Sequence, residues 1–278
     1  MSDFVSAGEL QELMAKGAVR VIDVRWRLDR PEAGHDDYLT GHIPGAVFAA
    51  LDTELSTHGA PSEGRHPLPT TEVLQAAVRR WGVRTGDTVV AYDDAKGMAA
   101  ARAWWLLRQA GVEVRVLDGG LSAWVAAGFA VAKDDVAPER GDIVLAELGR
   151  DALTIDEAAG FPASGVLLDV RAPERYRGET EPIDPIAGHI PGARNVPTTL
   201  HLDADGRVRD ADALRANFAE AGVVSGTPVA AYCGSGVTAA HTALILHELG
   251  IEAKVFPGSW SQWSNTPGRP VAVGDQPG

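Results

Sequence analysis

The chain has 278 residues, a formal net charge of −13 and 45% hydrophobic residues, a composition typical of a folded globular protein rather than of a disordered chain. Its length suffices for two domains, each with its own core. The acidic balance argues against a nucleic-acid-binding surface, which needs a basic face. No run of about 18 apolar residues predicts a membrane helix, and the first residues lack the features of a signal peptide, so we expect a cytoplasmic protein.

The chain contains a single cysteine, Cys233. One cysteine excludes an intramolecular disulfide, a CxxC redox pair and a zinc or iron–sulfur site built from several thiolates. The eight histidines show no spacing typical of a metal site. The sequence therefore predicts no metal and no cofactor.

An internal repeat divides the chain into two halves. The hexapeptide GHIPGA at 41–46 returns unchanged at 188–193, and several shorter segments repeat at similar spacing. A repeat this long indicates tandem domains rather than a solenoid. We expect an N-terminal domain over 1–132, a linker over 133–149 and a C-terminal domain over 150–278.

The two copies differ in length at one place. His42 and His189 are 147 residues apart, whereas Gly82 and Gly222 are only 140 apart, so the first copy has seven extra residues between His42 and Gly82. These residues belong to an arm over 52–68.

Each copy alternates short β-branched runs with helical patterns, which predicts an α/β domain with a mostly parallel sheet flanked by helices. In chain order, strands are expected at 19–24, 88–92, 112–117, 166–170, 228–232 and 252–256, and helices at 71–81, 98–110, 211–221 and 238–249. GHIPGA is expected to form a loop, because Pro lacks an amide donor and Gly permits positive φ. We favour a structural role for its His42 and His189 over a catalytic one.

The segment Cys233-Gly234-Ser235-Gly236-Val237-Thr238 follows an expected strand and precedes an expected helix. Ligands of open α/β sheets usually bind at this junction. The glycines let successive N–H groups converge on the sulfur, and the helix adds its positive N-terminal end. We therefore favour a reactive thiolate over a buried, inert cysteine. The first copy has Asp93 at the cysteine position, so the C-terminal domain is expected to carry the chemistry.

Together these features resemble the tandem-domain sulfurtransferases of the rhodanese family, and among them the 3-mercaptopyruvate type. The resemblance spans nearly the whole chain and includes Tyr38 before His42 and FPGSWSQW at 256–263. It implies two tandem rhodanese-like domains and a cysteine persulfide cradled by residues 233–238. Thiosulfate-using members typically carry an Arg-Lys pair after the cysteine, whereas this chain has Gly234-Ser235, as the mercaptopyruvate type does.

A 2-oxo acid donor needs a cationic clamp for its carboxylate. The resemblance implies that Arg175 binds this carboxylate. A second arginine expected a few residues later has no counterpart in the stretch 183–186. For Arg171 we favour a structural role linked to Asp169.

The resemblance also implies a Ser235, His66 and Asp52 relay that assists proton transfer. A histidine suits this role near neutral pH, and a carboxylate can fix its tautomer. The alternative interpretation of His66 is a polar residue on an exposed loop. The expected donor is a small anionic sulfur compound. The expected acceptor is an external thiol, a thioredoxin-like protein or cyanide, because the chain has no second cysteine to resolve a persulfide.

The residues around Cys233 bear on four other functions. A phosphatase needs Arg at the sixth position after the cysteine, where this chain has Ala239. A serine hydrolase needs glycines on both sides of Ser235 at GxSxG spacing, which Cys233 and Val237 break. A thiosulfate:cyanide sulfurtransferase and a non-catalytic sulfur-carrier module stay open as alternatives.

Overall fold

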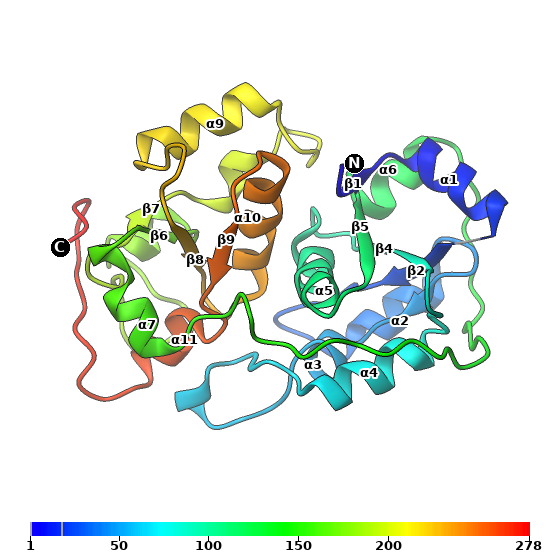
Figure 1. The fold of residues 1–278 in the computed structure, drawn as a ribbon, viewed down its shortest axis with the longest axis horizontal. Coiled ribbons are helices and arrows are strands. Elements are labelled where there is room, and N and C mark those ends of the chain that lie inside the picture. The colour runs from blue at the N-terminus through cyan, green and yellow to red at the C-terminus, as the bar shows by residue number, and fades with distance from the viewer. Residues whose placement is uncertain (1, 18) are drawn as a thin grey trace. The chain divides into compact units, whose positions relative to one another are not determined.

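A computed structural model describes residues 2–17 and 19–278. The chain forms two compact units (Figure 1). Unit 1 comprises Met1–Thr57, Leu68–Arg150 and Asp205–Arg207, and unit 2 comprises His58–Pro67, Asp151–Ala204 and Val208–Gly278. Two loops are thus exchanged: residues 58–67 of the first half pack with unit 2, and residues 205–207 of the second half pack with unit 1.

Unit 1 contains a five-stranded sheet in the order β1-β5-β4-β2-β3, with every pair parallel. Buried apolar side chains of these strands form its core together with Leu10 and Trp124 from the covering helices. The strands are β1 (Phe4–Val5), β2 (Val19–Asp23), β3 (Val47–Phe48), β4 (Thr88–Tyr92) and β5 (Glu113–Leu117). The helices are α1 (Ala7–Lys16), α2 (Ala33–Thr40), α3 (Leu51–Glu54), α4 (Thr71–Arg80), α5 (Met98–Gln109) and α6 (Gly120–Ala126).

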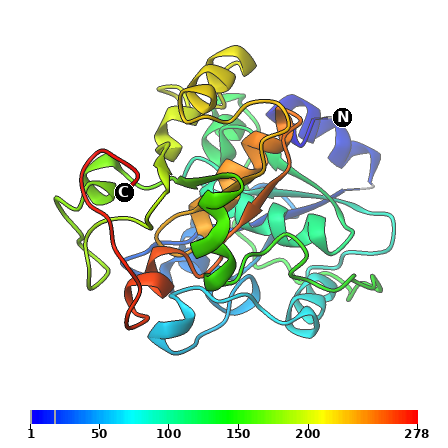
Figure 2. The same cartoon turned by 60° about the vertical axis from the view of Figure 1, so that its left-hand side comes forward.

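Unit 2 contains a four-stranded parallel sheet in the order β7-β6-β8-β9. Helix α10 lies against β8 and β9 (Figures 1 and 2). The strands are β6 (Val166–Asp169), β7 (Arg194–Asn195), β8 (Val229–Tyr232) and β9 (Ala253–Val255). The helices are α7 (Ile155–Gly160), α8 (Pro173–Tyr176), α9 (Ala211–Glu220), α10 (Val237–Glu248) and α11 (Ser259–Ser264), with 3-10 turns η1 (Pro61–Glu63), η2 (Phe161–Ala163) and η3 (Thr198–His201).

The predicted fold class is confirmed: both sheets are parallel and flanked by helices. Each of the six expected strands and four expected helices is present, with ends within one residue of the prediction. Helices α4 and α9 are followed by Gly82 and Gly222 at φ of +79° and +85°, the left-handed geometry that glycine adopts without strain. The sequence patterns missed β1, β3 and β7, which are only two residues long and carry no detectable period.

The repeated GHIPGA loop is held in the same way in both units. His42 and His189 are fully buried, and each ring stacks on a tyrosine, Tyr38 or Tyr176, whose carbonyl oxygen lies within 3.0 Å of the histidine Nδ1. These contacts anchor the loop to the preceding helix. They agree with a structural role for both histidines.

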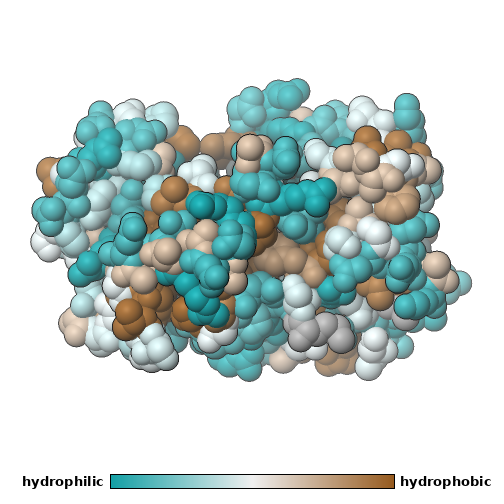
Figure 3. Space-filling model, turned by 90° about the horizontal axis from the view of Figure 1, so that it is seen from above, coloured by the Kyte–Doolittle hydropathy of each residue, from teal (hydrophilic) through white to brown (hydrophobic). Residues whose placement is uncertain are grey.

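Hydrophilic side chains cover most of the surface visible in Figure 3, and apolar ones form small patches. No described helix combines the length and the apolar character needed to cross a membrane.

Two further histidines are enclosed in unit 2. His201 and His241 are both buried, their rings are parallel with centroids 6.2 Å apart, and His201 Nε2 lies 3.2 Å from Thr242 Oγ1. Neither Nδ1 atom has a hydrogen-bond partner among the residues that the structure describes. Burial lowers the pKa of His201 to about 3 and that of His241 to about 4, because protonation would place charge in an apolar interior.

The buried pair makes stability pH-dependent. Below about pH 6.5 the unfolded chain binds protons at these rings, whereas the folded chain does not. The free energy of unfolding therefore decreases as the pH is lowered, by up to about 1.4 kcal/mol per pH unit for each ring. We expect His241→Leu to reduce the slope of unfolding free energy against pH between 6 and 4.5, measured by urea denaturation. The exposed His58, changed to Gln, is the control. An unchanged slope in His241→Leu contradicts the assignment.

Candidate functional site

Cys233 follows β8 directly, at the carboxyl end of the strand, and is 2% exposed. Its Sγ accepts a hydrogen bond from the Gly236 N–H at 3.1 Å. Gly236 has a φ of +80°, and a Cβ there would lie 2.3 Å from the Pro257 carbonyl oxygen, so only glycine fits. The loop therefore curls back onto the sulfur before α10 begins at Val237.

Ser259 holds the cysteine from the other side. Its Oγ accepts from the Cys233 N–H at 3.1 Å, donates to the Phe256 carbonyl at 2.8 Å and lies 4.0 Å from Sγ. Ser259 has a φ of +53°, which is strained for a residue with a side chain. The equivalent residue of unit 1 is Gly120, at a φ of +55°. The serine thus accepts backbone strain that a glycine would avoid, and supplies a hydroxyl at the cysteine.

The equivalent junction of unit 1 contains Asp93. Its Oδ1 accepts from the N–H groups of Ala95 and Gly97, both at 2.8 Å, and its Oδ2 from those of Ala99 and Ala100 at 2.8 and 2.9 Å. Burial raises the pKa of this carboxyl, and these hydrogen bonds act in the opposite direction. The junction is an anion cradle, filled by the chain's own carboxylate.

The residues of this cradle have counterparts at the same positions of the repeat in unit 2. Helices α5 and α10 begin at Met98 and Val237, so Gly97 corresponds to Gly236, and the two amides of the first helical turn correspond to those of Thr238 and Ala239. The loop of unit 2 is one residue shorter and contains a thiol in place of the carboxylate. Of its N–H groups, that of Gly236 donates to Cys233 Sγ at 3.1 Å.

Two of the predicted relay residues lie together. His66 Nδ1 is 2.8 Å from Ser235 Oγ, and His66 is buried. His66 reaches Ser235 on the loop 58–67, whose turn η1 contacts α11 (Figures 1 and 2). Asp52 lies in α3 of unit 1, where its Oδ2 accepts from the Trp26 Nε1–H at 3.0 Å. Its place as the third relay member stays a prediction.

Four acceptor atoms from three residues hold Arg171 in place. It forms hydrogen bonds with both Asp169 oxygens, with Glu181 and with the Gly188 carbonyl, and its guanidinium lies 4.5 Å from the centre of the Trp260 ring. Its side chain is 1% exposed. These contacts agree with the structural role favoured from the sequence.

Arg175 lies nearer the cysteine loop. Its Nε and Nη2 donate to the two Glu181 oxygens at 3.0 and 2.6 Å, and Nη2 also donates to Asp184 at 3.4 Å. The Nη1 atom lies 3.7 Å from the position that a Cβ on Gly234 would occupy. Arg175 thus presents one free edge of its guanidinium toward the residue after the cysteine.

The sequence reasoning missed Arg65. Its Nη1 and Nη2 donate to the two oxygens of Asp184 at 3.0 and 3.4 Å, and Nη2 lies 3.7 Å from the same position beside Gly234. The available signal was its place directly before His66 in the longer arm of the first copy. No pattern in the sequence shows that this arm reaches the cysteine loop of the other half.

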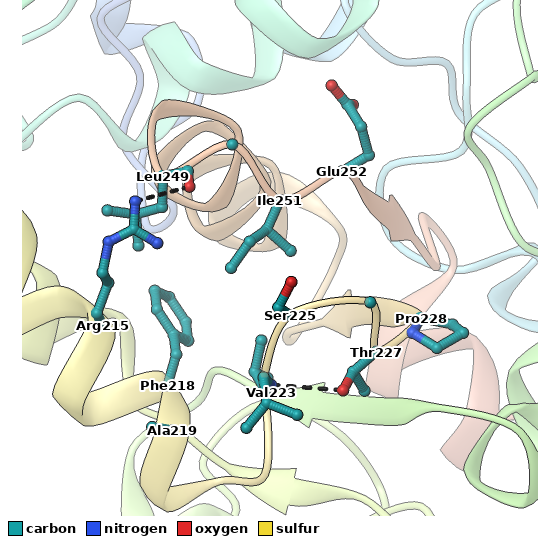
Figure 4. A pocket seen from close by; sticks show the side chains of 13 residues that line it. Arg215, Phe218, Ala219, Val223, Ser225, Thr227, Pro228, Leu249, Ile251 and Glu252 are labelled. Atoms are coloured by element: carbon teal, nitrogen blue, oxygen red, sulfur yellow. Dashed lines mark hydrogen bonds between the residues drawn. The ribbon is translucent and has the colours of Figure 1, made fainter.

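A separate pocket of about 600 Å³ in unit 2 contains none of the predicted site residues (Figure 4). Pro228 and Glu252, which line it, directly precede β8 and β9, so it lies at the amino ends of these parallel strands. Arg215 beside it donates to the Leu249 carbonyl at 2.9 Å. The pocket therefore lies at the amino ends of the strands, whereas Cys233 lies at their carboxyl ends.

Comparisons with known proteins agree with the duplicated architecture. The rhodanese-like domain family matches residues 6–127 and 154–266. The putative thiosulfate sulfurtransferase SseB of Mycobacterium tuberculosis is 47% identical over 277 residues, which cover 97% of this chain and 96% of SseB. The probable 3-mercaptopyruvate sulfurtransferase of Pseudomonas aeruginosa is 42% identical, over 99% of both chains. The structure of 3-mercaptopyruvate sulfurtransferase from Leishmania major superposes with a TM-score of 0.84 at 29% identity, covering 95% of this chain and 74% of that one.

The chain belongs to the rhodanese family and contains two rhodanese-like domains in tandem. Within that family it is a sulfurtransferase, of the 3-mercaptopyruvate or the thiosulfate type.

The contacts of Ser259 predict an order of stabilities. Ser259→Ala leaves the buried Cys233 N–H without its acceptor, which is expected to lower the free energy of unfolding by about 1–3 kcal/mol. Ser259→Gly loses the same hydrogen bond but relieves the left-handed strain, so it should be about 1 kcal/mol more stable than Ser259→Ala. Urea denaturation of both variants measures the difference. If the free energy of unfolding of Ser259→Ala equals or exceeds that of Ser259→Gly, backbone strain at this position is not significant.

Proposed function

We propose that the chain transfers a sulfane sulfur from 3-mercaptopyruvate through a Cys233 persulfide to an external thiol or cyanide. The observation that carries this proposal is the 2.8 Å contact between His66 Nδ1 and Ser235 Oγ in the loop of the cysteine. A hydroxyl and an imidazole in contact form a proton path, which a thiol donor needs and thiosulfate does not.

The first half-reaction is a displacement at sulfur. The Cys233 thiolate attacks the thiol sulfur of the donor, the carbon–sulfur bond breaks, and its electron pair passes to carbon as pyruvate enolate. The thiol proton moves through Ser235 and His66 to that carbon, so pyruvate leaves and a cysteine persulfide anion stays. Backbone amides at the start of α10 stabilise this anion, as the equivalent amides of unit 1 do for Asp93.

The second half-reaction regenerates the thiolate. An acceptor thiolate or cyanide attacks the outer sulfur of the persulfide, and the sulfur–sulfur bond breaks with its electron pair on Cys233. Because Cys233 is the chain's single cysteine, the acceptor comes from outside.

Thiosulfate is the second candidate donor. It is favoured by the name of the 47% identical relative from Mycobacterium tuberculosis. Against it, the two residues that follow the cysteine, Gly234 and Ser235, carry no charged side chain of their own.

Intact-mass measurement tests the proposed function. Incubation with 3-mercaptopyruvate is expected to add one sulfur atom to the wild-type chain and none to Cys233→Ser, with pyruvate released in equal amount. The same incubation with thiosulfate compares the donors. Addition of sulfur from thiosulfate alone, or equal addition to Cys233→Ser, would overturn the proposal.

The proposed proton path predicts a split between donors. Ser235→Ala and His66→Gln are each expected to lower kcat/KM for 3-mercaptopyruvate by about 10²- to 10⁴-fold, because general acid–base assistance is lost, and to leave transfer from thiosulfate much less affected. Asp52→Asn should show the same split if it orients His66. Ser225→Ala, in the distant pocket of Figure 4, is the control. An equal loss with both donors would contradict a role in proton transfer.

A further inference from the structure

An extended segment of the linker, residues 138–148, packs along α4 and the turn between α5 and β5 of unit 1. Within this linker segment, Ile143 and Leu145 are each 8% exposed, whereas Val144 between them is 75% exposed. This alternation is typical of an extended chain with one side against a protein surface. Unit 1 thus holds the linker segment in the manner of a bound peptide.

Hydrogen bonds from α4, and from the turns before β4 and β5, hold the linker segment in place. Gln75 Oε1 accepts from the Leu145 N–H at 3.0 Å. The carbonyl oxygens of Arg79 and Ala110 accept from the N–H groups of residues 141 and 146, at 2.8 and 2.9 Å. The Thr85 N–H donates to the carboxylate of residue 142 at 3.0 Å. These four contacts fix both the direction and the register of the segment.

The repeat places equivalent residues in unit 2. Glycines at positive φ mark the same turns in both units, Gly82 and Gly111 in unit 1 and Gly222 and Gly250 in unit 2. Counted from these glycines, the four linker-binding residues of unit 1 have as counterparts Arg215, Ala219, Ser225 and Leu249. All four line the pocket of about 600 Å³ (Figure 4). The pocket therefore corresponds to the site that the linker segment occupies in unit 1.

No described segment takes the place of the linker in this pocket. The Ser225 N–H has no acceptor among the described residues, whereas its counterpart Thr85 donates to the linker segment. Apolar side chains line much of the pocket, among them Phe218, Val223 and Ile251 (Figure 4). An apolar surface beside an unused main-chain donor suits an extended peptide.

Arg215 indicates how a peptide in this pocket ends. In unit 1 the Ala110 carbonyl accepts from the N–H of residue 146, but in unit 2 the equivalent Leu249 carbonyl accepts from Arg215 Nη2 at 2.9 Å. The guanidinium, which can only donate, thus takes the place of the peptide N–H that follows Leu145. A chain that ends one residue earlier brings a carboxylate to this cation, whereas a chain that continues brings another donor. The carboxylate of Glu252, which also lines the pocket, points away from Arg215 (Figure 4).

The other end of the pocket is less charged than its counterpart in unit 1. Arg84, which pairs with Glu139 of the linker at 3.1 Å, corresponds to Val224. Arg79, whose Nε donates to a linker carbonyl at 2.8 Å, corresponds to Ala219. The pocket of unit 2 therefore favours an apolar chain whose acid group lies at its carboxyl end.

We propose that the pocket of unit 2 binds the carboxyl-terminal segment of a partner protein in extended form, with aliphatic side chains at its last and third-last positions and its terminal carboxylate on Arg215. The segment follows the course that residues up to Leu145 take along unit 1. Binding is independent of the sulfur donor, because the pocket lies at the amino ends of the strands and Cys233 at their carboxyl ends.

Fluorescence anisotropy with two synthetic peptides tests the proposal on the full chain. Both have the sequence of residues 140–145, RGDIVL, and an N-terminal fluorophore; one ends in a free carboxylate and the other in an amide. We expect the acid to bind saturably below about 1 mM and about tenfold more tightly than the amide, because only the acid gains a charge-assisted hydrogen bond with Arg215. Arg215→Gln should bind the two peptides equally.

Two substitutions on α9 separate the pocket from the surrounding surface. Ala216 and Ala219 are both exposed, but only Ala219 lines the pocket. Ala219→Trp is expected to weaken binding of the acid by at least about tenfold, because the indole fills the pocket, whereas Ala216→Trp should bind it like the wild type. Cys233→Ser should also bind like the wild type, which keeps this test separate from that of the proposed function.

Three results would overturn the proposal. Absence of saturable binding to the wild type, or equal binding to Ala219→Trp, means that the pocket is not a peptide site. Equal affinity of the wild type for acid and amide contradicts capture of a terminal carboxylate. Self-association of the wild type that Ala219→Trp abolishes, without peptide binding, makes a second copy of the chain the occupant. If Ala219→Trp does not fold, Val224→Glu at the exposed rim gives the same comparison.

Discussion

At the strand-to-helix junction of unit 1, backbone N–H groups converge on one anion, and the repeat places Cys233 at the same junction of unit 2. In unit 1 four such groups hold the Asp93 carboxylate within 2.9 Å. The glycine at positive φ and the following helix recur at Cys233, where the Gly236 N–H donates to Sγ. The halves therefore differ in what fills the cradle. The Asp93 carboxylate cannot accept and release a sulfur atom, whereas the thiolate of Cys233 can. Unit 1 therefore keeps its cradle filled by its own side chain.

A cradle alone leaves the sulfur without a neighbouring imidazole, and the exchanged loop 58–67 places His66 beside Ser235 in the cysteine loop. It extends from the first half of the chain and packs with unit 2. A Cβ on Gly64 would lie 2.8 Å from the Gly258 carbonyl, so the loop backbone approaches the start of α11 closely. Arg65 and His66 follow at once. The longer arm of the first copy thus has a physical role: it positions side chains that the second half does not encode.

The sequence predicted those parts of the molecule that local rules determine. Periodicity predicted the strands and helices, and glycine spacing together with the preceding strand predicted the junction at Cys233. The pairing of His66 with Ser235 came from family resemblance, since the two residues are 169 positions apart. Arg65 was missed because its place beside Gly234 depends on where a loop packs, and no local pattern encodes a packing partner so far along the chain. The resemblance implied a second arginine a few residues after Arg175, where this chain has none, whereas Arg65 lies in the longer arm of the first copy, directly before His66.

Each arginine of the site has a carboxylate partner, and solvent exposure separates their roles. Arg171 and Asp169 are fully enclosed, and an unpaired charge at that depth would cost several kcal/mol, so this pair stays intact. Arg175 and Arg65 are progressively more open. Water and a ligand can reach their outer N–H groups while Glu181 and Asp184 keep the charges balanced behind them. An anion that reaches them can gain hydrogen bonds without leaving a buried carboxylate unpaired, because the inner N–H groups of both arginines keep their carboxylate partners.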